Sequence, residues 1–114
     1  MSKVVSKNNT EHYNWGINCD GWYLLKTTEL SIIQEKVPPS KFEVKHYHKK
    51  SKQFFFVLKG TATISVDGAE HSINEQNGIF IDAKIPHQLI NKSNEDIEFL
   101  VISSPESHSD RVEL

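Results

Sequence analysis

The amino-acid sequence predicts an all-β protein with the architecture of a sandwich or barrel. Turn signals divide the chain into pieces too short for helices, and these pieces are rich in β-branched and aromatic residues without a helical period. Three dipeptides place a glycine where a tight hairpin needs a positive φ: Lys59-Gly60, Asp67-Gly68 and Asn77-Gly78. Eight or nine short strands joined by such turns are typical of a sandwich or barrel.

Each expected strand takes its limits from the breaks on either side of it. Pro38-Pro39-Ser40 ends the second apolar run, the three glycine dipeptides separate the central runs, and the polar stretch 91–96 separates the last two. In chain order, strands are expected at residues 22–25, 30–37, 42–48, 53–58, 61–66, 69–73, 79–81, 87–91 and 97–103.

Length and composition limit the kind of molecule that these strands can form. The chain has 114 residues, enough for one domain with one core. Thirteen basic residues nearly balance fifteen acidic ones, and no basic block is present, so we expect no nucleic-acid partner. No apolar run is long enough to span a bilayer and residues 1–11 are polar, so we expect a soluble, cytoplasmic protein. The single cysteine, Cys19, excludes an intrachain disulfide and a thiolate metal cluster.

Two expected strands, 53–58 and 97–103, are apolar on both faces. A strand with core on one side and water on the other alternates between apolar and polar residues, so the second apolar face needs a cover. We expect a homodimer through this face. In the alternative, Trp15, Trp22 and the N-terminal strands supply the cover within one chain.

Three histidines form a candidate site. His46 and His48 share one face of a strand, with Cα atoms roughly 6.6 Å apart, so both imidazoles can reach one small ligand. His87 follows directly after Pro86 in a later strand.

The two histidine segments resemble the two conserved motifs of the cupin superfamily, and the chain is similar to a small single-domain cupin. The first motif is matched by His46-Tyr47-His48, Gln53 and Gly60, and the second by Gly78, Pro86-His87 and Asn91. The resemblance covers residues 30–103. It implies a double-stranded β-helix, or jelly-roll barrel, at 15–104. We expect a flexible or strand-swapping N-terminal arm at 1–14 before it and a C-terminal tail at 105–114 after it.

Five positions depart from the motif pattern. Ser40, Gln76 and Lys84 stand where the motifs have glycine, and Asp82 stands where the second motif has proline. These four changes fall in turns and are expected to affect backbone geometry alone. Gln53 replaces a glutamate, so it offers a metal a neutral carbonyl oxygen in place of a charge and is expected to weaken metal binding.

The resemblance implies that His46, His48 and His87 bind a divalent metal inside the barrel, with Gln53 as a fourth ligand or as a partner of bound water. These ligands do not select among zinc, nickel, iron, copper and manganese. Cupins with such sites include dioxygenases, isomerases and hydrolases. We therefore expect a small-molecule ligand in the barrel and leave the reaction open.

Two alternatives remain from the sequence. The segment from His46 to Gln53 also resembles that of sugar-nucleotide ketoisomerases of the same superfamily, in which a histidine pair moves protons without a metal. The second alternative is a non-catalytic sensing module. Its ligand would stack on aromatic side chains drawn from Trp22, Tyr47, Phe55 and Phe80. Core packing is nevertheless the expected role of Phe55 and Phe80, and Tyr47 is expected to face away from the pocket because it points opposite to its flanking histidines.

Overall fold

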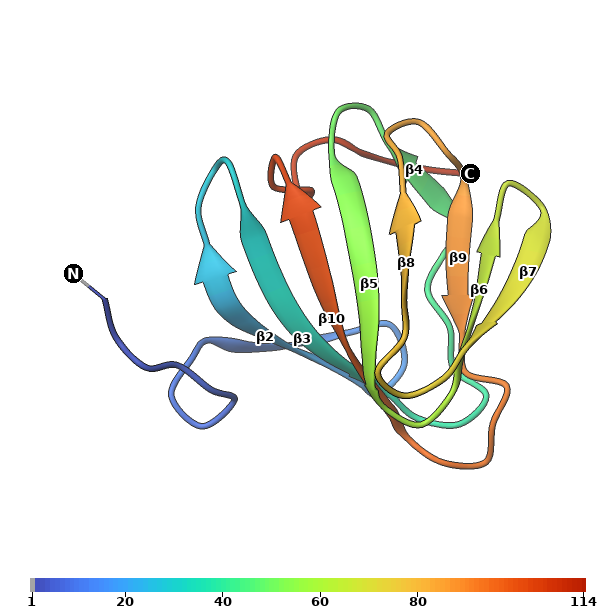
Figure 1. The fold of residues 1–114 in the computed structure, drawn as a ribbon, viewed down its shortest axis with the longest axis horizontal. Coiled ribbons are helices and arrows are strands. Elements are labelled where there is room, and N and C mark those ends of the chain that lie inside the picture. Colours follow the sequence, from blue (N-terminus) through green and yellow to red (C-terminus); the bar gives the residue numbers. More distant parts are fainter. Residues whose placement is uncertain (1) are drawn as a thin grey trace.

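The computed structural model describes residues 2–114 and consists of strands arranged in two sheets (Figure 1). The strands are β1 (His12–Trp15), β2 (Cys19–Lys26), β3 (Ser31–Val37), β4 (His46–His48), β5 (Lys52–Lys59), β6 (Ala62–Val66), β7 (Ala69–Ile73), β8 (Gly78–Ile81), β9 (His87–Ile90), β10 (Ile97–Ser104) and β11 (Arg111–Glu113).

The two sheets face each other and enclose the core. One has six strands in the order β1-β2-β3-β10-β5-β8, and the other has five in the order β11-β4-β9-β6-β7. Every ladder is antiparallel. The inward residues of β5 and β10, among them Phe55, Val57 and Phe99, are almost wholly buried. This is the two-sheet arrangement of a jelly roll, and it confirms the predicted all-β class.

All nine expected strands are present, but one of them is shorter than predicted. The prediction of a strand at 42–48 was wrong for the first half of this segment, because a ladder forms only at β4. Phe42 makes a single isolated bridge, and Phe42 and Val44 point outward with about half of their surface exposed, whereas the Glu43 side chain points inward. The apolar residues of this segment therefore lie on its solvent side, opposite to the expectation for a strand over the core.

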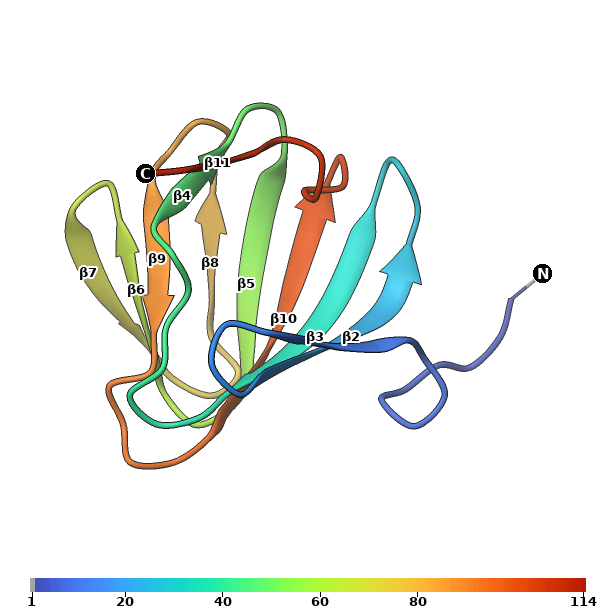
Figure 2. The same ribbon diagram turned by 180° about the vertical axis from the view of Figure 1, so that it is seen from behind.

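Two strands, β1 and β11, were not predicted. Each is the edge strand of its sheet, and β11 has only three residues, so neither carries an extended apolar pattern. β1 pairs with β2, and β11 pairs with β4 at the open end of the fold (Figure 2). The segments expected as an N-terminal arm and a C-terminal tail thus each contribute a strand.

The glycine turns follow the prediction in two of three cases. Asp67 and Gly68 both have positive φ, at 50° and 87°, as a two-residue hairpin of type I′ requires. Gly60 also has positive φ, at 82°. Gly78 does not: it begins β8, and a Cβ there would lie 2.6 Å from the Phe54 ring. The close approach of the Phe54 ring therefore explains the glycine at this position, and the prediction that Gly78 forms a hairpin turn was wrong.

The positions where the sequence lacks the motif glycines keep a glycine-like backbone. Ser40, Gln76 and Lys84 have φ values of 70°, 65° and 69°, in the left-handed region that disfavours residues with a Cβ. The substitutions therefore retained the turn geometry at a cost in backbone strain. In the described part of the chain, residues 2–114, no helix has the length and apolar character needed to cross a membrane.

We predict that Gln76→Gly stabilises the fold by about 0.5–1 kcal/mol, because relief of the left-handed strain outweighs the extra chain entropy of glycine. The Gln76 side chain is exposed, and its backbone N–H keeps its bond to the Val57 carbonyl in the variant. Urea unfolding would measure the change. Gln76→Ala is the control, since alanine retains the strain, and destabilisation by Gln76→Gly would contradict the explanation.

Candidate metal centre

Three buried imidazoles meet inside the barrel. His46 and His48 lie on β4, and the cross-strand pairing of His46 with His87 brings in β9. The side chains of His46, His48 and His87 are 2%, 4% and 2% exposed. The ring centroids of His46 and His87 are 4.4 Å apart. One ring nitrogen from each residue can be chosen so that all three lie within 4.8 Å of one another. The structure thus brings the three predicted histidines together.

Each ring is oriented by a hydrogen bond from Nδ1. His46 Nδ1–H donates to the Val44 carbonyl at 2.7 Å, and His87 Nδ1–H donates to the Ile85 carbonyl at 2.9 Å. His48 Nδ1–H donates to a carboxylate oxygen of Asp110 at 2.9 Å. Because carbonyl and carboxylate oxygens accept and do not donate, these bonds assign the proton to Nδ1. The Nε2 atom of each neutral ring therefore retains its lone pair.

Burial keeps the three rings neutral. Desolvation is the largest cause of the lowered pKa of His46, which falls to about 3, and it also lowers the pKa of His48 and His87. Neutral imidazole is the form that ligates a metal, so no proton has to be displaced at neutral pH.

Two buried polar atoms at the site lack a partner within the described residues. They are His87 Nε2 and Gln53 Oε1. The Gln53 amide is held at its other end, where Nε2 donates to the Ser103 hydroxyl at 3.0 Å. An unpaired lone pair in a buried site is costly, and a cation would satisfy both acceptors. The donor set, three imidazoles and an amide carbonyl, fits a divalent first-row metal.

Asp110 supports the site from the C-terminal segment. Besides accepting from His48, its carboxylate accepts from the backbone N–H groups of Lys50 and Ser51, each at 2.8 Å. Burial alone would raise the pKa of Asp110, but these hydrogen bonds outweigh that effect and hold the pKa below its usual value. Sequence reasoning missed this residue because it lies in a short polar segment far from both motifs.

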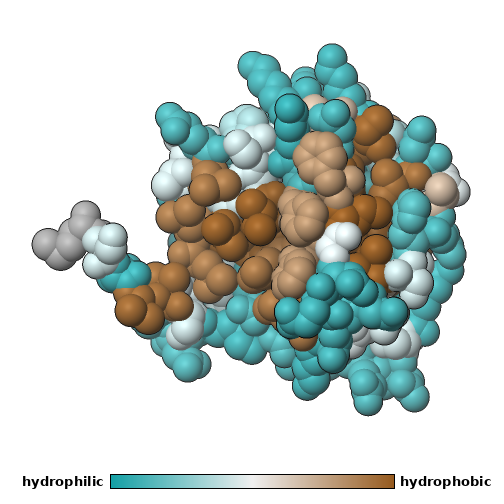
Figure 3. Space-filling view, viewed as in Figure 1, coloured by the Kyte–Doolittle hydropathy of each residue, from teal (hydrophilic) through white to brown (hydrophobic). Residues whose placement is uncertain are grey.

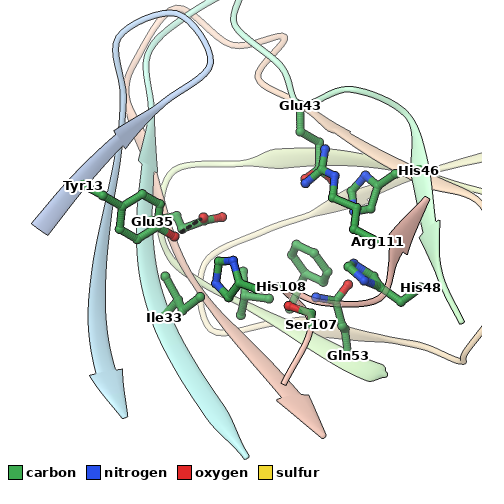
Figure 4. A pocket seen from close by; sticks show the side chains of 12 residues that line it. Tyr13, Ile33, Glu35, Glu43, His46, His48, Gln53, Ser107, His108 and Arg111 are labelled. Carbon is green, nitrogen blue, oxygen red and sulfur yellow. Dashed lines mark hydrogen bonds between the residues drawn. The ribbon is translucent and has the colours of Figure 1, made fainter. Parts of the chain in front are cut away.

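His46 and His48 line one side of a cavity of about 100 Å³ (Figure 4). Of the aromatic residues considered for stacking, Phe55 lines this cavity, whereas Trp22, Tyr47 and Phe80 do not. Phe55 also belongs to the core, as expected. The core role expected for Phe80 was wrong, because this side chain is 55% exposed on the outside of the six-stranded sheet.

The cavity also contains two acidic side chains that no sequence motif singled out. Glu35 accepts a hydrogen bond from the Tyr13 hydroxyl at 3.1 Å, and Glu43 accepts one from the Leu89 backbone N–H at 2.9 Å. Desolvation is the largest cause of their raised pKa values, about 7 for Glu35 and about 8 for Glu43. Both carboxyls therefore titrate near neutral pH.

Comparisons with known proteins agree with the fold and the motifs. A family model described as a cupin domain matches residues 34–103. The chain is 26% identical over 88 residues to the uncharacterized protein MJ1618 of Methanocaldococcus jannaschii, with 76% of this chain and 70% of that protein covered.

Two solved structures share the fold at low sequence identity. The polyketide cyclase RemF from Streptomyces resistomycificus has a TM-score of 0.86 and 17% identity, with 100% of this chain and 86% of that chain covered. A predicted oxalate decarboxylase from Thermotoga maritima has a TM-score of 0.84 and 19% identity, with 91% of this chain and 100% of that chain covered. These comparisons confirm the predicted resemblance and the jelly-roll fold.

We predict that Asp110→Asn inverts the tautomer of His48. The asparagine carbonyl can accept the two backbone N–H groups, which turns its NH₂ toward His48 Nδ1 and requires a lone pair there. The ring proton then moves to Nε2, the atom that faces the other histidines. Nitrogen chemical shifts of ¹⁵N-labelled imidazole would report the change. Glu113→Gln, on β11, which begins directly after Asp110, is the control, and an unchanged His48 tautomer in Asp110→Asn would contradict the assignment.

Proposed function

The chain belongs to the cupin domain family, and on that premise we propose that it binds a divalent metal through His46, His48 and His87, with Gln53 assisting, and that it acts on a small molecule in the barrel. The observation that carries this proposal is the set of three buried, neutral imidazoles whose Nδ1 atoms are all occupied. Only the Nε2 lone pairs remain for a ligand, and a metal is the partner that three converging lone pairs suit best.

The residues present define what a bound metal would contribute. A divalent ion there would act as a Lewis acid toward a carbonyl or hydroxyl oxygen of a ligand. Asp110 keeps His48 in the ligating tautomer, a role that carboxylates commonly have behind metal-binding histidines. The identity of the metal stays open among zinc, nickel, iron, copper and manganese, because imidazole and amide ligands do not decide it.

The cavity favours a small ligand. Its volume of about 100 Å³ lies well below the roughly 300–1,000 Å³ typical of pockets for drug-sized molecules. Carboxyls that titrate near neutral pH beside the histidines support a catalytic role, because proton transfer needs such groups. We therefore favour a metal-dependent enzyme over a sensing module that only holds its ligand.

A metal-free ketoisomerase is the less favoured alternative. That reaction needs histidines that gain and lose protons near neutral pH, whereas the pKa values of all three site histidines are lowered by burial. Of Lys and Arg residues, Arg111 alone lines the cavity within the described residues, and a nucleoside diphosphate calls for more positive charge.

We predict that metal-free wild-type protein binds one zinc ion per chain and that His87→Ala weakens this binding more than about 100-fold, since even supporting residues are worth 10- to 100-fold. Gln53→Glu should tighten it on the order of tenfold by adding a charge. Elemental analysis and isothermal titration would measure both. His71→Ala, exposed on β7, is the control.

The wild-type protein and the Gln53→Glu variant test different parts of the proposal. Wild-type protein that binds no zinc, nickel, iron, copper or manganese would remove the metal site. Weaker or unchanged binding by Gln53→Glu would place Gln53 outside the ligand set while leaving the three histidines in it.

We also propose that the protein forms a homodimer through the outer face of the six-stranded sheet. A cross-strand row of apolar residues, Ile32, Ile102, Phe54 and Phe80, runs over β3, β10, β5 and β8. Phe54 and Phe80 are 38% and 55% exposed, and the space-filling view shows an apolar area over this sheet (Figure 3).

This apolar row can pack against the same row on a second copy of the protein. An isologous interface needs a self-complementary patch, and a row without charged side chains can meet its own copy without like-charge repulsion. Trp22 and the N-terminal segment cover a different part of the sheet, where Lys7 lies over the Trp22 ring and pairs with Glu98. The row itself has no such cover in residues 2–114.

We predict that wild-type protein sediments as a dimer at micromolar concentration and that Phe80→Lys shifts it to monomer, because a buried, unpaired ammonium is costly. Phe42→Lys is the matched control, since Phe42 is 53% exposed but lies outside the row. A monomeric wild type in sedimentation velocity would remove the dimer.

A further inference from the structure

Glu35 and Tyr13 face the histidines from the opposite side of the cavity (Figure 4). Glu35 lies on β3 and Tyr13 on β1, and both line the cavity together with His46 and His48. The Tyr13 hydroxyl donates to Glu35 Oε2 at 3.1 Å. The proposed metal site does not use either side chain, so their presence needs a separate explanation.

The strand register shows that this contact is built into the sheet. Tyr13 pairs with Gly21 on β2, and Gly21 pairs with Glu35 on β3, so the three residues form one cross-strand row. A Cβ at Gly21 would lie 2.6 Å from the Tyr13 hydroxyl oxygen. Because Gly21 has no side chain, the Tyr13 ring lies across β2 and reaches Glu35. A close approach of this kind is a recognised reason for glycine within a strand.

Glu35 has one occupied oxygen and one that is free to react. Tyr13 binds Oε2, and no hydrogen bond within residues 2–114 reaches Oε1. The titratable and charged groups that face Glu35, directly or across the cavity, are Tyr13, Cys19, Tyr23, Glu43, Arg111, His46, His48 and His108. None of them forms an ion pair with it, so the carboxyl is not locked in its charged form.

We infer that Glu35 is the acid–base residue of this site, positioned by Tyr13, and that its substrate is a small carbonyl compound with a C–H bond beside the carbonyl, held at the histidine centre. This inference rests on the proposed metal site. Glu35 Oε1 accepts the proton as the C–H bond beside the carbonyl breaks. The electron pair of that bond forms a C=C bond to the carbonyl carbon, and the π pair of the C=O bond moves onto the carbonyl oxygen. In the reverse step Oε1 returns the proton to carbon. No oxidant or reductant is required.

The other candidates are less suited to this role. The Nε2 atoms of the histidines are the proposed metal ligands, and their Nδ1 protons are held by hydrogen bonds. Glu43 already accepts the Leu89 backbone N–H. A pKa of about 7 lets Glu35 act as an acid or a base at neutral pH.

Exchange of carbon-bound hydrogen tests the inference directly. Zinc-loaded wild-type protein in D₂O is expected to accelerate loss of the C–H proton signal of dihydroxyacetone, and Glu35→Gln should lower the rate about 100-fold or more. Zinc affinity and thermal stability should stay unchanged. Glu70→Gln, an exposed carboxyl on β7 that pairs with Lys92, is the control.

A second measurement does not depend on turnover. In the metal-free protein, infrared difference titration should show a carboxyl losing its proton near pH 7, and this step should vanish in Glu35→Gln but remain in Glu43→Gln. Tyr13→Phe should move the step to higher pH, because the Tyr13 hydrogen bond favours the ionised form.

The outcomes separate this inference from the metal site. Zinc-loaded wild type that leaves dihydroxyacetone unexchanged, or Glu35→Gln that exchanges it at the wild-type rate, would overturn the role of Glu35 while metal binding stands. Protein that binds no metal would remove both proposals. Loss of exchange in Glu35→Gln with intact zinc binding, together with the Tyr13→Phe shift, would support the inference.

Discussion

The candidate site depends on one cross-strand pairing, that of His46 on β4 with His87 on β9. β4 has three residues and β9 has four, so little of the ladder hydrogen bonding is available to hold the two histidine segments in register. The Nδ1 bonds to the Val44 and Ile85 carbonyls and to Asp110 supply the remaining orientation. A shift of one residue would turn the rings to the other face and remove the site.

Burial sets the chemistry of both sides of the cavity. On the histidine side, desolvation lowers the pKa values and keeps the rings as neutral donors of lone pairs. The same desolvation raises the pKa values of Glu35 on the opposite side and of Glu43 next to the histidine strands, so these carboxyls hold protons near neutral pH. Burial in one barrel therefore favours metal-ligand chemistry and proton-transfer chemistry in adjacent positions.

The two ends of the chain complete the site that the motifs begin. β1 contributes Tyr13 to the cavity wall, and the segment leading into β11 contributes Asp110 behind His48. Both strands lie at sheet edges, where few neighbours hold them. The barrel core provides rigid walls, whereas the groups that tune the site come from its least constrained strands.

The sequence by itself determined the fold class and the central strands, because alternation along a strand and turn chemistry are local properties, and its resemblance to the two cupin motifs identified the three histidines. It failed at 42–48, where Glu43 faces inward, and at Gly78, which a neighbouring ring explains. Only the tertiary structure decided that Asp110 meets His48 and that Tyr13 reaches Glu35 across Gly21. These contacts depend on which strands become neighbours and in what register, and no local pattern in the chain specifies that choice.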